Sequence, residues 1–90
     1  MKTELGELTL EDIGAAITRR RDTLAKTQAE LSGMANIHWV TMSRIESGKV
    51  DFKVSTLVRL CDALSYSPGK LFALAIAMKG RRDGAARRAG

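Results

Sequence analysis

The stretch that decides the fold is Thr27–Lys49, TQAELSGMANIHWVTMSRIESGK, which predicts two short helices joined by a tight turn. Thr27 and Glu30 have the spacing of a capping box, in which each side chain bonds the backbone amide of the other, so a helix begins at Gln28. Asn36 is expected to end this helix, because asparagine is second only to glycine in the left-handed conformation that closes a helix.

Both helices of this pair have an apolar side. The apolar side chains are Leu31, Met34 and Ala35 in the first helix and Ile37, Met42 and Ile45 in the second. The second helix, about 39–47, therefore leaves Trp39, Val40, Ser43 and Arg44 pointing elsewhere. A helix that offers solvent a compact set of contact groups is suited to reading a DNA groove.

A first helix is predicted upstream of the pair. Thr9 is its N-cap, and Asp12, three residues on, completes the start signal. The expected buried stripe contains Leu10, Ile13, Ile17 and Leu24. Gly14 and Ala16 let a neighbouring element approach this helix closely.

Two further helices are predicted downstream. Gly48 is expected to adopt a positive φ in the turn that follows the pair. A fourth helix covers roughly Val54–Leu64 and lacks a good cap at its start. Its expected apolar residues are Val54, Leu57, Val58, Leu60, Cys61 and Leu64. Ser67 as cap and Pro68 at the first helical position open a fifth helix, which we expect to end at about Lys79.

The composition favours one all-α domain. The 90 residues include one proline and only 4% aromatic residues, so the core must be aliphatic. No alternating run rich in valine and threonine predicts a strand. We expect an acidic N-terminal arm over residues 1–8, a helical domain over residues 9–79 and a basic flexible tail over residues 80–90, which has no apolar face to bury.

The net charge of +5 and the pI of about 9.9 favour a polyanionic partner, with nucleic acid ahead of membrane. Residues 1–12 carry −3 and residues 80–90 carry +3, so the middle of the chain carries +5. The folded part is therefore basic even without its tail.

Several residues stand at mutually consistent spacings: Gln28, Leu31, Ile45, Glu46, Gly48, Lys49, Leu57 and Leu64. Together they resemble the helix-turn-helix domain of phage repressor and Cro-type regulators, over roughly residues 9–75. The sequence departs from the family pattern at Lys26, Ser32, Asn36 and Phe52-Lys53, and none of these removes a groove contact. The resemblance implies a compact five-helix bundle of the lambda-repressor-like type and a sequence-specific DNA-binding transcriptional regulator, a repressor that occupies an operator.

The resemblance also implies that the helix over residues 39–47 enters the major groove. By position, Trp39, Val40, Ser43 and Arg44 match the base-facing set. The guanidinium of Arg44 can bond O6 and N7 of one guanine, whereas Trp39 and Val40 can pack on thymine methyl groups. The alternative for Trp39 is a surface plug packed back onto the domain.

Contacts to the DNA backbone are expected around this helix. The family uses the glutamine that matches Gln28 to hold a phosphate or reach a base edge, and the alternative is a solvated side chain. Thr27 is expected mainly to cap its helix and secondarily to lie near a phosphate. His38 is expected mainly to begin its helix, and the alternative is a phosphate contact. The other candidates are Thr41, Lys49 and Lys53, although lysines on turns are often only solvated.

One pair of residues has an implied structural role. The family pairs an arginine at the position of Arg21 with the glutamate that matches Glu46, and we carry this over as a partly buried ion pair that orients the reading helix. Arg19 and Arg20 are expected to be solvated.

The fifth helix is apolar on more than one face. Leu71, Leu74 and Met78 form one stripe, which leaves Phe72 and Ile76, with Tyr66 as a further candidate, for a partner. A homodimer is the economical interpretation, because a two-fold DNA site needs two reading helices. The alternative is a last helix that is simply well buried.

Other classes of protein find little support. Cys61 has no cysteine partner, and with a single histidine we expect no metal site and no cofactor. No Cys/His pair, phosphate-binding glycine loop or paired carboxylates indicate an enzyme. No apolar stretch approaches the ~20 residues of a membrane span, so we expect no membrane partner and a cytoplasmic protein.

One alternative function remains open. The segment GKVDFKVSTLVRLCDAL, residues 48–64, resembles small antitoxins that neutralise a kinase-like toxin. An antitoxin of this kind would bind both a toxin protein and its own promoter.

Overall fold

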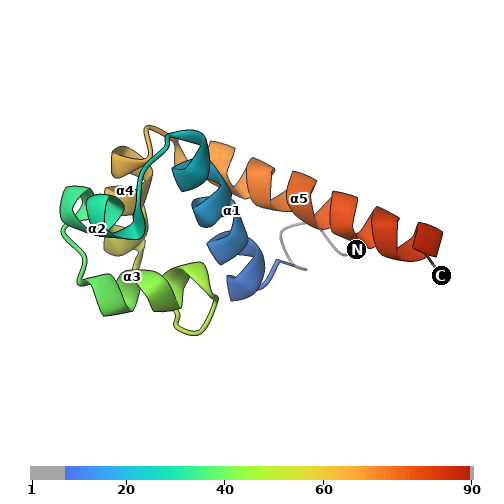
Figure 1. Cartoon of the computed structure of the whole chain (residues 1–90), viewed down its shortest axis with the longest axis horizontal. Coiled ribbons are helices and arrows are strands. Elements are labelled where there is room, and N and C mark those ends of the chain that lie inside the picture. The colour runs from blue at the N-terminus through green and yellow to red at the C-terminus, as the bar shows by residue number, and fades with distance from the viewer. Residues whose placement is uncertain (1–7, 90) are drawn as a thin grey trace.

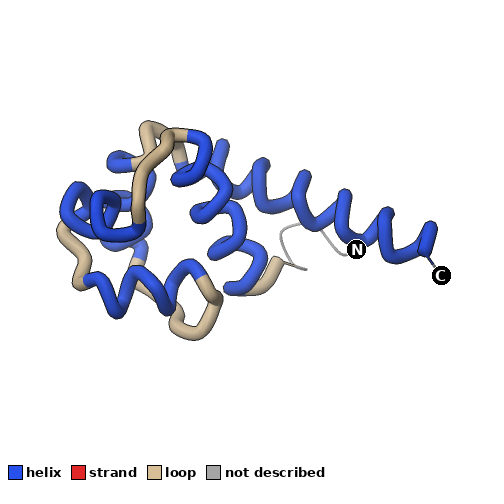
Figure 2. The backbone as a smooth tube through the Cα atoms, in the orientation of Figure 1, coloured by secondary structure: helices blue, strands red, loops and turns tan. Residues whose placement is uncertain are grey.

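Five α-helices and no strand form within the part of the chain that the computed structural model describes, which is the backbone of residues 8–89 and the side chains of residues 8–81. The helices are α1 (Leu10–Thr23), α2 (Gln28–Ala35), α3 (Trp39–Glu46), α4 (Val54–Ala63) and α5 (Pro68–Ala89). Short loops join them (Figure 2). The first four helices and the start of α5 form the body of the molecule, from which the rest of α5 projects (Figure 1).

The helix starts follow from local sequence signals. Thr9 and Asp12 form a complete capping box at α1, with the Thr9 amide 2.9 Å from the Asp12 carboxylate. Thr27 and Glu30 form a second one at α2, with both bonds at 3.0 Å. The Ser67 hydroxyl accepts a bond from the backbone of the first turn of α5, whereas α4 begins without a side-chain cap. These starts are confirmed.

The core is aliphatic, as the scarcity of aromatic residues requires. The largest fully buried side chains are Ile17, Leu31, Met42, Ile45, Leu60, Leu64 and Leu71. Helix α1 packs against both α3 and α5, and α2 packs against α4. Every helix therefore contributes to one hydrophobic cluster. Within this cluster α1 and α2 both pack against α3 and fix its position.

Two glycines permit close approaches that a side chain would prevent. A Cβ atom at Gly14 would collide with the backbone carbonyls of Ile45 and Glu46, so α1 lies directly against the end of α3. Gly48 has a φ of +74°, and a Cβ there would collide with Glu11. Both glycines hold the C-terminal end of α3 against α1, which confirms the roles expected from the sequence.

The expected apolar faces of two helices are too broad. Met34 is 53% exposed, because the buried side of α2 runs through Leu31, Ser32 and Ala35 instead. In α4 the side chains of Val54 and Val58 are also exposed. A short helix that meets the core along one stripe leaves its flanking apolar residues in solvent.

The fifth helix differs from the expectation in its end and in its buried stripe. It continues past Lys79 to Ala89, so the expected end at Lys79 is wrong; alanine and arginine rank among the best helix formers and can extend a helix without an apolar face. Whether this extension is mobile in solution stays a prediction. Leu71 and Ala75 are its fully buried residues, whereas Leu74 and Met78 flank them and are only partly buried.

Arg20 and Arg59 donate hydrogen bonds to backbone carbonyls at the ends of helices. The sequence did not predict these bonds. The Arg20 Nε atom donates to the carbonyl of Leu64 at 2.9 Å, and the guanidinium carbon lies 4.2 Å from the ring centroid of Tyr66. The Arg59 Nε atom donates to the carbonyl of Ala35 at 3.0 Å. The expectation that Arg20 is solvated is therefore wrong, because the free carbonyls at the end of α4 offer it acceptors.

Candidate nucleic-acid interface

One side of α3 faces solvent while the other is fixed in the core. Met42 and Ile45 are 0% and 1% exposed, and Glu46 is buried beside them. The exposed side carries the predicted base-facing residues: Trp39, Ser43 and Arg44 are exposed, and Val40 is partly buried. Residues three and four apart share a face of a helix, so these four side chains form one surface, which we call the α3 face.

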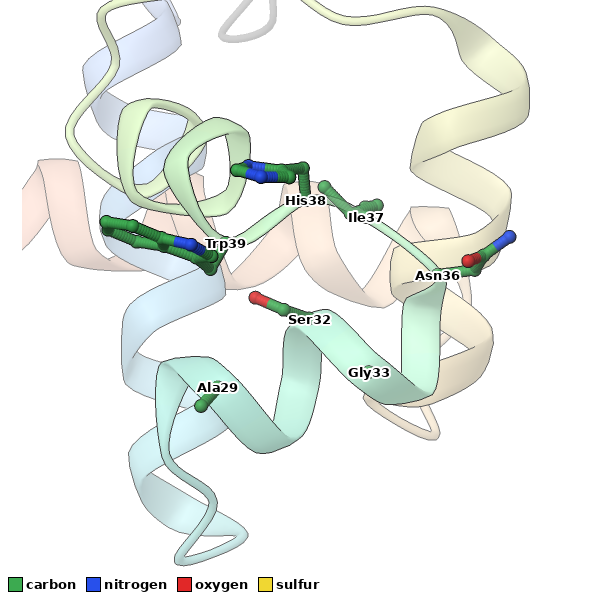
Figure 3. Close-up of a pocket in the computed structure, with 7 residues that line it drawn as sticks. All are labelled: Ala29, Ser32, Gly33, Asn36, Ile37, His38 and Trp39. Carbon is green, nitrogen blue, oxygen red and sulfur yellow. The ribbon is translucent and has the colours of Figure 1, made fainter.

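Trp39 lies in solvent at the start of this surface. Its side chain is 65% exposed, which rules out the alternative of a plug packed onto the domain. Its ring stacks on that of His38, with centroids 5.9 Å apart and an interplanar angle of 25°. Figure 3 shows both rings at the edge of a pocket between the start of α3 and Ala29, Ser32 and Gly33 of α2.

His38 begins α3, as expected. Its Nδ1 atom accepts a hydrogen bond from the backbone amide of Val40 at 3.2 Å, so the imidazole acts as the N-cap.

A buried carboxylate ties the end of α3 to the two preceding helices. Glu46 accepts bonds from Arg21 at 2.8 Å and 3.0 Å, from the Thr18 hydroxyl at 2.9 Å and from the Gln28 side-chain amide at 3.0 Å. Its side chain is only 4% exposed. We call Thr18, Arg21, Gln28 and Glu46 the Glu46 cluster. The implied Arg21–Glu46 ion pair is thus present, whereas sequence reasoning missed the part of Thr18.

Arg21 serves both the cluster and the loop before α2. Its NH1 group donates to the backbone carbonyl of Lys26 at 2.9 Å, directly before the capping residue Thr27. The hydrogen bond to Glu46 raises the pKa of the Arg21 guanidinium above its ordinary value, and burial opposes this rise. One side chain therefore holds the start of α2 and the end of α3 at the same time.

The predicted contacts at the start of α2 have partners inside the protein. The Gln28 side chain donates to Glu46, and the Thr27 hydroxyl accepts the bond from the Glu30 amide. Thr27 is exposed and Gln28 is partly buried. The internal bond of Gln28 contradicts the alternative of a purely solvated side chain.

The remaining candidates flank the α3 face. Thr41 is exposed on α3 itself, and Lys49 and Lys53 are exposed in the loop between α3 and α4. Because both lysines are exposed, their ammonium groups are accessible from solvent.

A model of the Cro/C1-type helix-turn-helix DNA-binding domain matches residues 19–75, more than half of the chain. The chain belongs to this family. The match spans the helix-turn-helix unit of α2 and α3, all four residues of the α3 face, and Arg21, Gln28 and Glu46 of the Glu46 cluster.

Solved structures show the same helix-turn-helix fold. A structure of the clp gene regulator ClgR from Corynebacterium glutamicum superposes with a TM-score of 0.77 at 25% identity, covering 89% of this chain and 88% of that one. A second ClgR structure gives 0.75 at 26% identity, with 78% and 90% covered. The restriction-modification controller protein C.AhdI from Aeromonas hydrophila, at 19% identity, shares the fold with a TM-score of 0.67 over 69% of this chain and 94% of that one. No match was found among curated protein sequences.

Two further properties of this helix-turn-helix domain concern other kinds of site. No helix among the described residues is long and apolar enough to span a membrane. Within residues 8–81, no three or more histidine, cysteine, aspartate or glutamate side chains gather where they could hold a metal ion.

Proposed function

We propose that this protein is a sequence-specific regulator of transcription that acts by placing the α3 face in the major groove of an operator. The observation that carries this proposal is the division of α3 into two sides. Met42, Ile45 and Glu46 fix the helix in the body, while Trp39 and Arg44 remain open to a partner. A rigidly held helix with exposed polar and aromatic groups suits direct readout of bases.

Each group of the interface has a distinct proposed task. Arg44 bonds one guanine, and Trp39 and Val40 pack on thymine methyl groups. Lys49 and Lys53 meet phosphates, as do the backbone amides at the start of α2, where the helix dipole favours an anion. Base contacts supply the sequence preference, and phosphate contacts fix the orientation of the domain on the duplex.

A homodimer on a two-fold operator extends this proposal. Two copies would set their α3 helices about one DNA turn, ~34 Å, apart. Phe72 is the supporting observation, because it lines an apolar groove with Leu8, Leu10 and Ile13 on the outside of α1 and α5. Ile76 is partly exposed one helical turn further along.

Selection of bound sequences from a random DNA pool tests the proposal. We expect a short motif, repeated with two-fold symmetry, to which the protein binds more tightly than to random DNA. If the selected pool keeps the random base composition, the protein does not read sequence and the proposal is wrong.

Arg44→Ala then tests the reading residue. We expect this variant to cost ~1–3 kcal/mol of binding to the selected site and to relax the preference at one base pair. Arg19→Ala removes the same charge from the exposed side of α1 and serves as the matched control, with no change in preference expected. An equal loss on selected and random DNA would mean that Arg44 touches only phosphate.

A further inference from the structure

The side chain of Gln28 is bonded inside the protein, at the point where α2 would approach DNA. Its Nε2 atom donates to the Oε1 atom of Glu46 at 3.0 Å, although the two residues are 18 apart in sequence. Gln28 is the first residue of α2 and Glu46 is the last residue of α3. One hydrogen bond therefore joins the N-terminal end of one helix of the unit to the C-terminal end of the other.

We propose that Gln28 is a positioning residue: its side chain acts on DNA binding through Glu46, by holding the start of α2 at a fixed place relative to the α3 face. The inference rests on the proposed function, since it concerns how two parts of that DNA-binding surface are held together. It assigns the phosphate contact at this point to the α2 backbone instead of the Gln28 side chain.

The surroundings of Glu46 favour this role over a phosphate contact. The acceptor is a charged carboxylate, and hydrogen bonds to charged groups are stronger than bonds between neutral groups. The Arg21 guanidinium and the Thr18 hydroxyl hold the same carboxylate in place. A phosphate that reached for the Gln28 amide would have to displace it from this fixed and charged acceptor.

Positioning matters here because the two ends of the unit have different tasks. The α3 face reads bases, whereas the backbone amides at the start of α2 bond a phosphate only at donor–acceptor distances of about 2.7–3.2 Å, which a small displacement of α2 destroys. Arg21 holds the loop before α2 through the carbonyl of Lys26, and Gln28 holds the first residue of the helix itself. Without the hydrogen bond from Gln28 to Glu46, the start of α2 can shift while its core residue Leu31 stays buried.

Gln28→Met tests the proposal, because methionine keeps the length of the side chain and its helix propensity but cannot donate to Glu46. Affinity for the selected site is measured at a temperature where circular dichroism shows parent and variant fully folded. We expect binding about tenfold weaker, the equivalent of ~1.4 kcal/mol, with an unchanged preferred sequence. A residue that only adds stability would leave the affinity of the fully folded protein unchanged.

Gly33→Ala supplies a matched stability control. A Cβ at Gly33 has no neighbour within 4 Å, so alanine there stabilises α2 without a new contact. We expect Gln28→Met combined with Gly33→Ala to be more stable than Gln28→Met alone and still to bind about tenfold more weakly than the parent. If the double variant recovers full affinity, Gln28 contributes only to the stability of α2, and the proposal is wrong.

Gln28→Met in a background without the Glu46 acceptor, Arg21→Met with Glu46→Leu, separates the two roles. If Gln28 acts through Glu46, Gln28→Met causes no further loss of affinity in this background when the proteins compared are fully folded. The same tenfold loss in both backgrounds would make the Gln28 side chain a direct phosphate contact, and a parent-like affinity for Gln28→Met alone would also refute the proposal. Failure of the parent to select any motif would instead refute the proposed function.

Discussion

Glu46 combines a buried charge with four hydrogen bonds. Single and double substitutions in its cluster should therefore differ in their effect on the free energy of unfolding. Its carboxylate is enclosed by Arg21, Thr18 and Gln28, so each oxygen has a donor. Removing a charge of this kind from water is costly, and the ion pair mainly offsets that cost. The cluster therefore contributes to where α3 lies more than to net stability.

Glu46→Ala should lower the free energy of unfolding by about 3–5 kcal/mol, because it leaves the Arg21 guanidinium buried without its partner. Arg21→Met combined with Glu46→Leu should be milder than Glu46→Ala alone, since no charge then remains buried. Urea denaturation followed by circular dichroism measures both. Asp62→Ala removes an exposed carboxylate from α4 and should change little. A fully stable Glu46→Ala that fails to bind DNA would show a direct contact instead.

For single residues, the sequence predicted the contact that follows from the family spacing. It missed the hydrogen bonds that depend on how the helices pack in three dimensions. Arg21 and Glu46 were paired because their positions match a family pattern. The bonds from Thr18 and Gln28 to the same carboxylate join α1, α2 and α3, so no local pattern reveals them. The bond from Arg20 to the end of α4 spans 44 residues and was missed for the same reason.

Among the helices, starts were predicted better than ends. A capping box is a local signal of four residues, and both boxes are present. Helix ends depend on a left-handed residue, which was predicted at Asn36 because of its type but missed at Ala25 and Ser65, whose φ angles are +55° and +52°. Alanine and serine do not signal this conformation, although local backbone bonds close both turns, from Lys26 to the carbonyl of Arg21 and from Tyr66 to that of Cys61.

Ala25→Gly should stabilise the protein by about 0.5–1 kcal/mol, because glycine adopts a positive φ without the steric cost of a Cβ atom. The midpoint of urea unfolding measures the change. Ala15→Gly, within α1, is the control with the opposite sign, since glycine inside a helix is destabilising. A lower midpoint for Ala25→Gly would mean that the methyl group of Ala25 has a packing role that outweighs its strain.

The capping box of α2 should make stability depend on acid. Hydrogen bonds from the backbone and side chain of Thr27 lower the pKa of Glu30 below its ordinary value. A lowered folded pKa means that the contribution is present above the unfolded pKa and is lost as the pH falls through the folded one. Glu30→Gln should remove this part of the acid dependence, as urea midpoints measured between neutral and acidic pH will show. An unchanged pH profile would contradict the prediction.

For the molecule as a whole, the sequence predicted the number of helices and the aliphatic core but not which apolar residues face outward. Met34, Val54 and Val58 are exposed, because helix packing decides which flank of an apolar stripe meets the core. Packing decides this in α5 too, where Ala75 is buried and Ile76 is only partly buried. Surplus apolar surface on α5 is the basis for expecting a second copy there.

Ile76→Glu should give a folded monomer that binds the selected two-fold site weakly, because each half-site alone supplies only part of the contacts. Ala77→Glu puts the same charge on an exposed position of α5 and is the matched control, with dimerisation retained. Phe72→Glu should act in the same direction through the groove that Phe72 lines with Leu8 and Ile13. Sedimentation measures the state of each variant. A parent protein that stays monomeric on a two-fold site would disprove the dimer.

The exposed position of Trp39 has a spectroscopic consequence. It is the only tryptophan of the chain, and 65% of its side chain is already in water in the folded state. Unfolding therefore changes the solvent around this fluorophore little, so its emission is a poor measure of folding. DNA placed against the start of α3 would exclude that water, so the same emission would report occupancy of the operator without any added label.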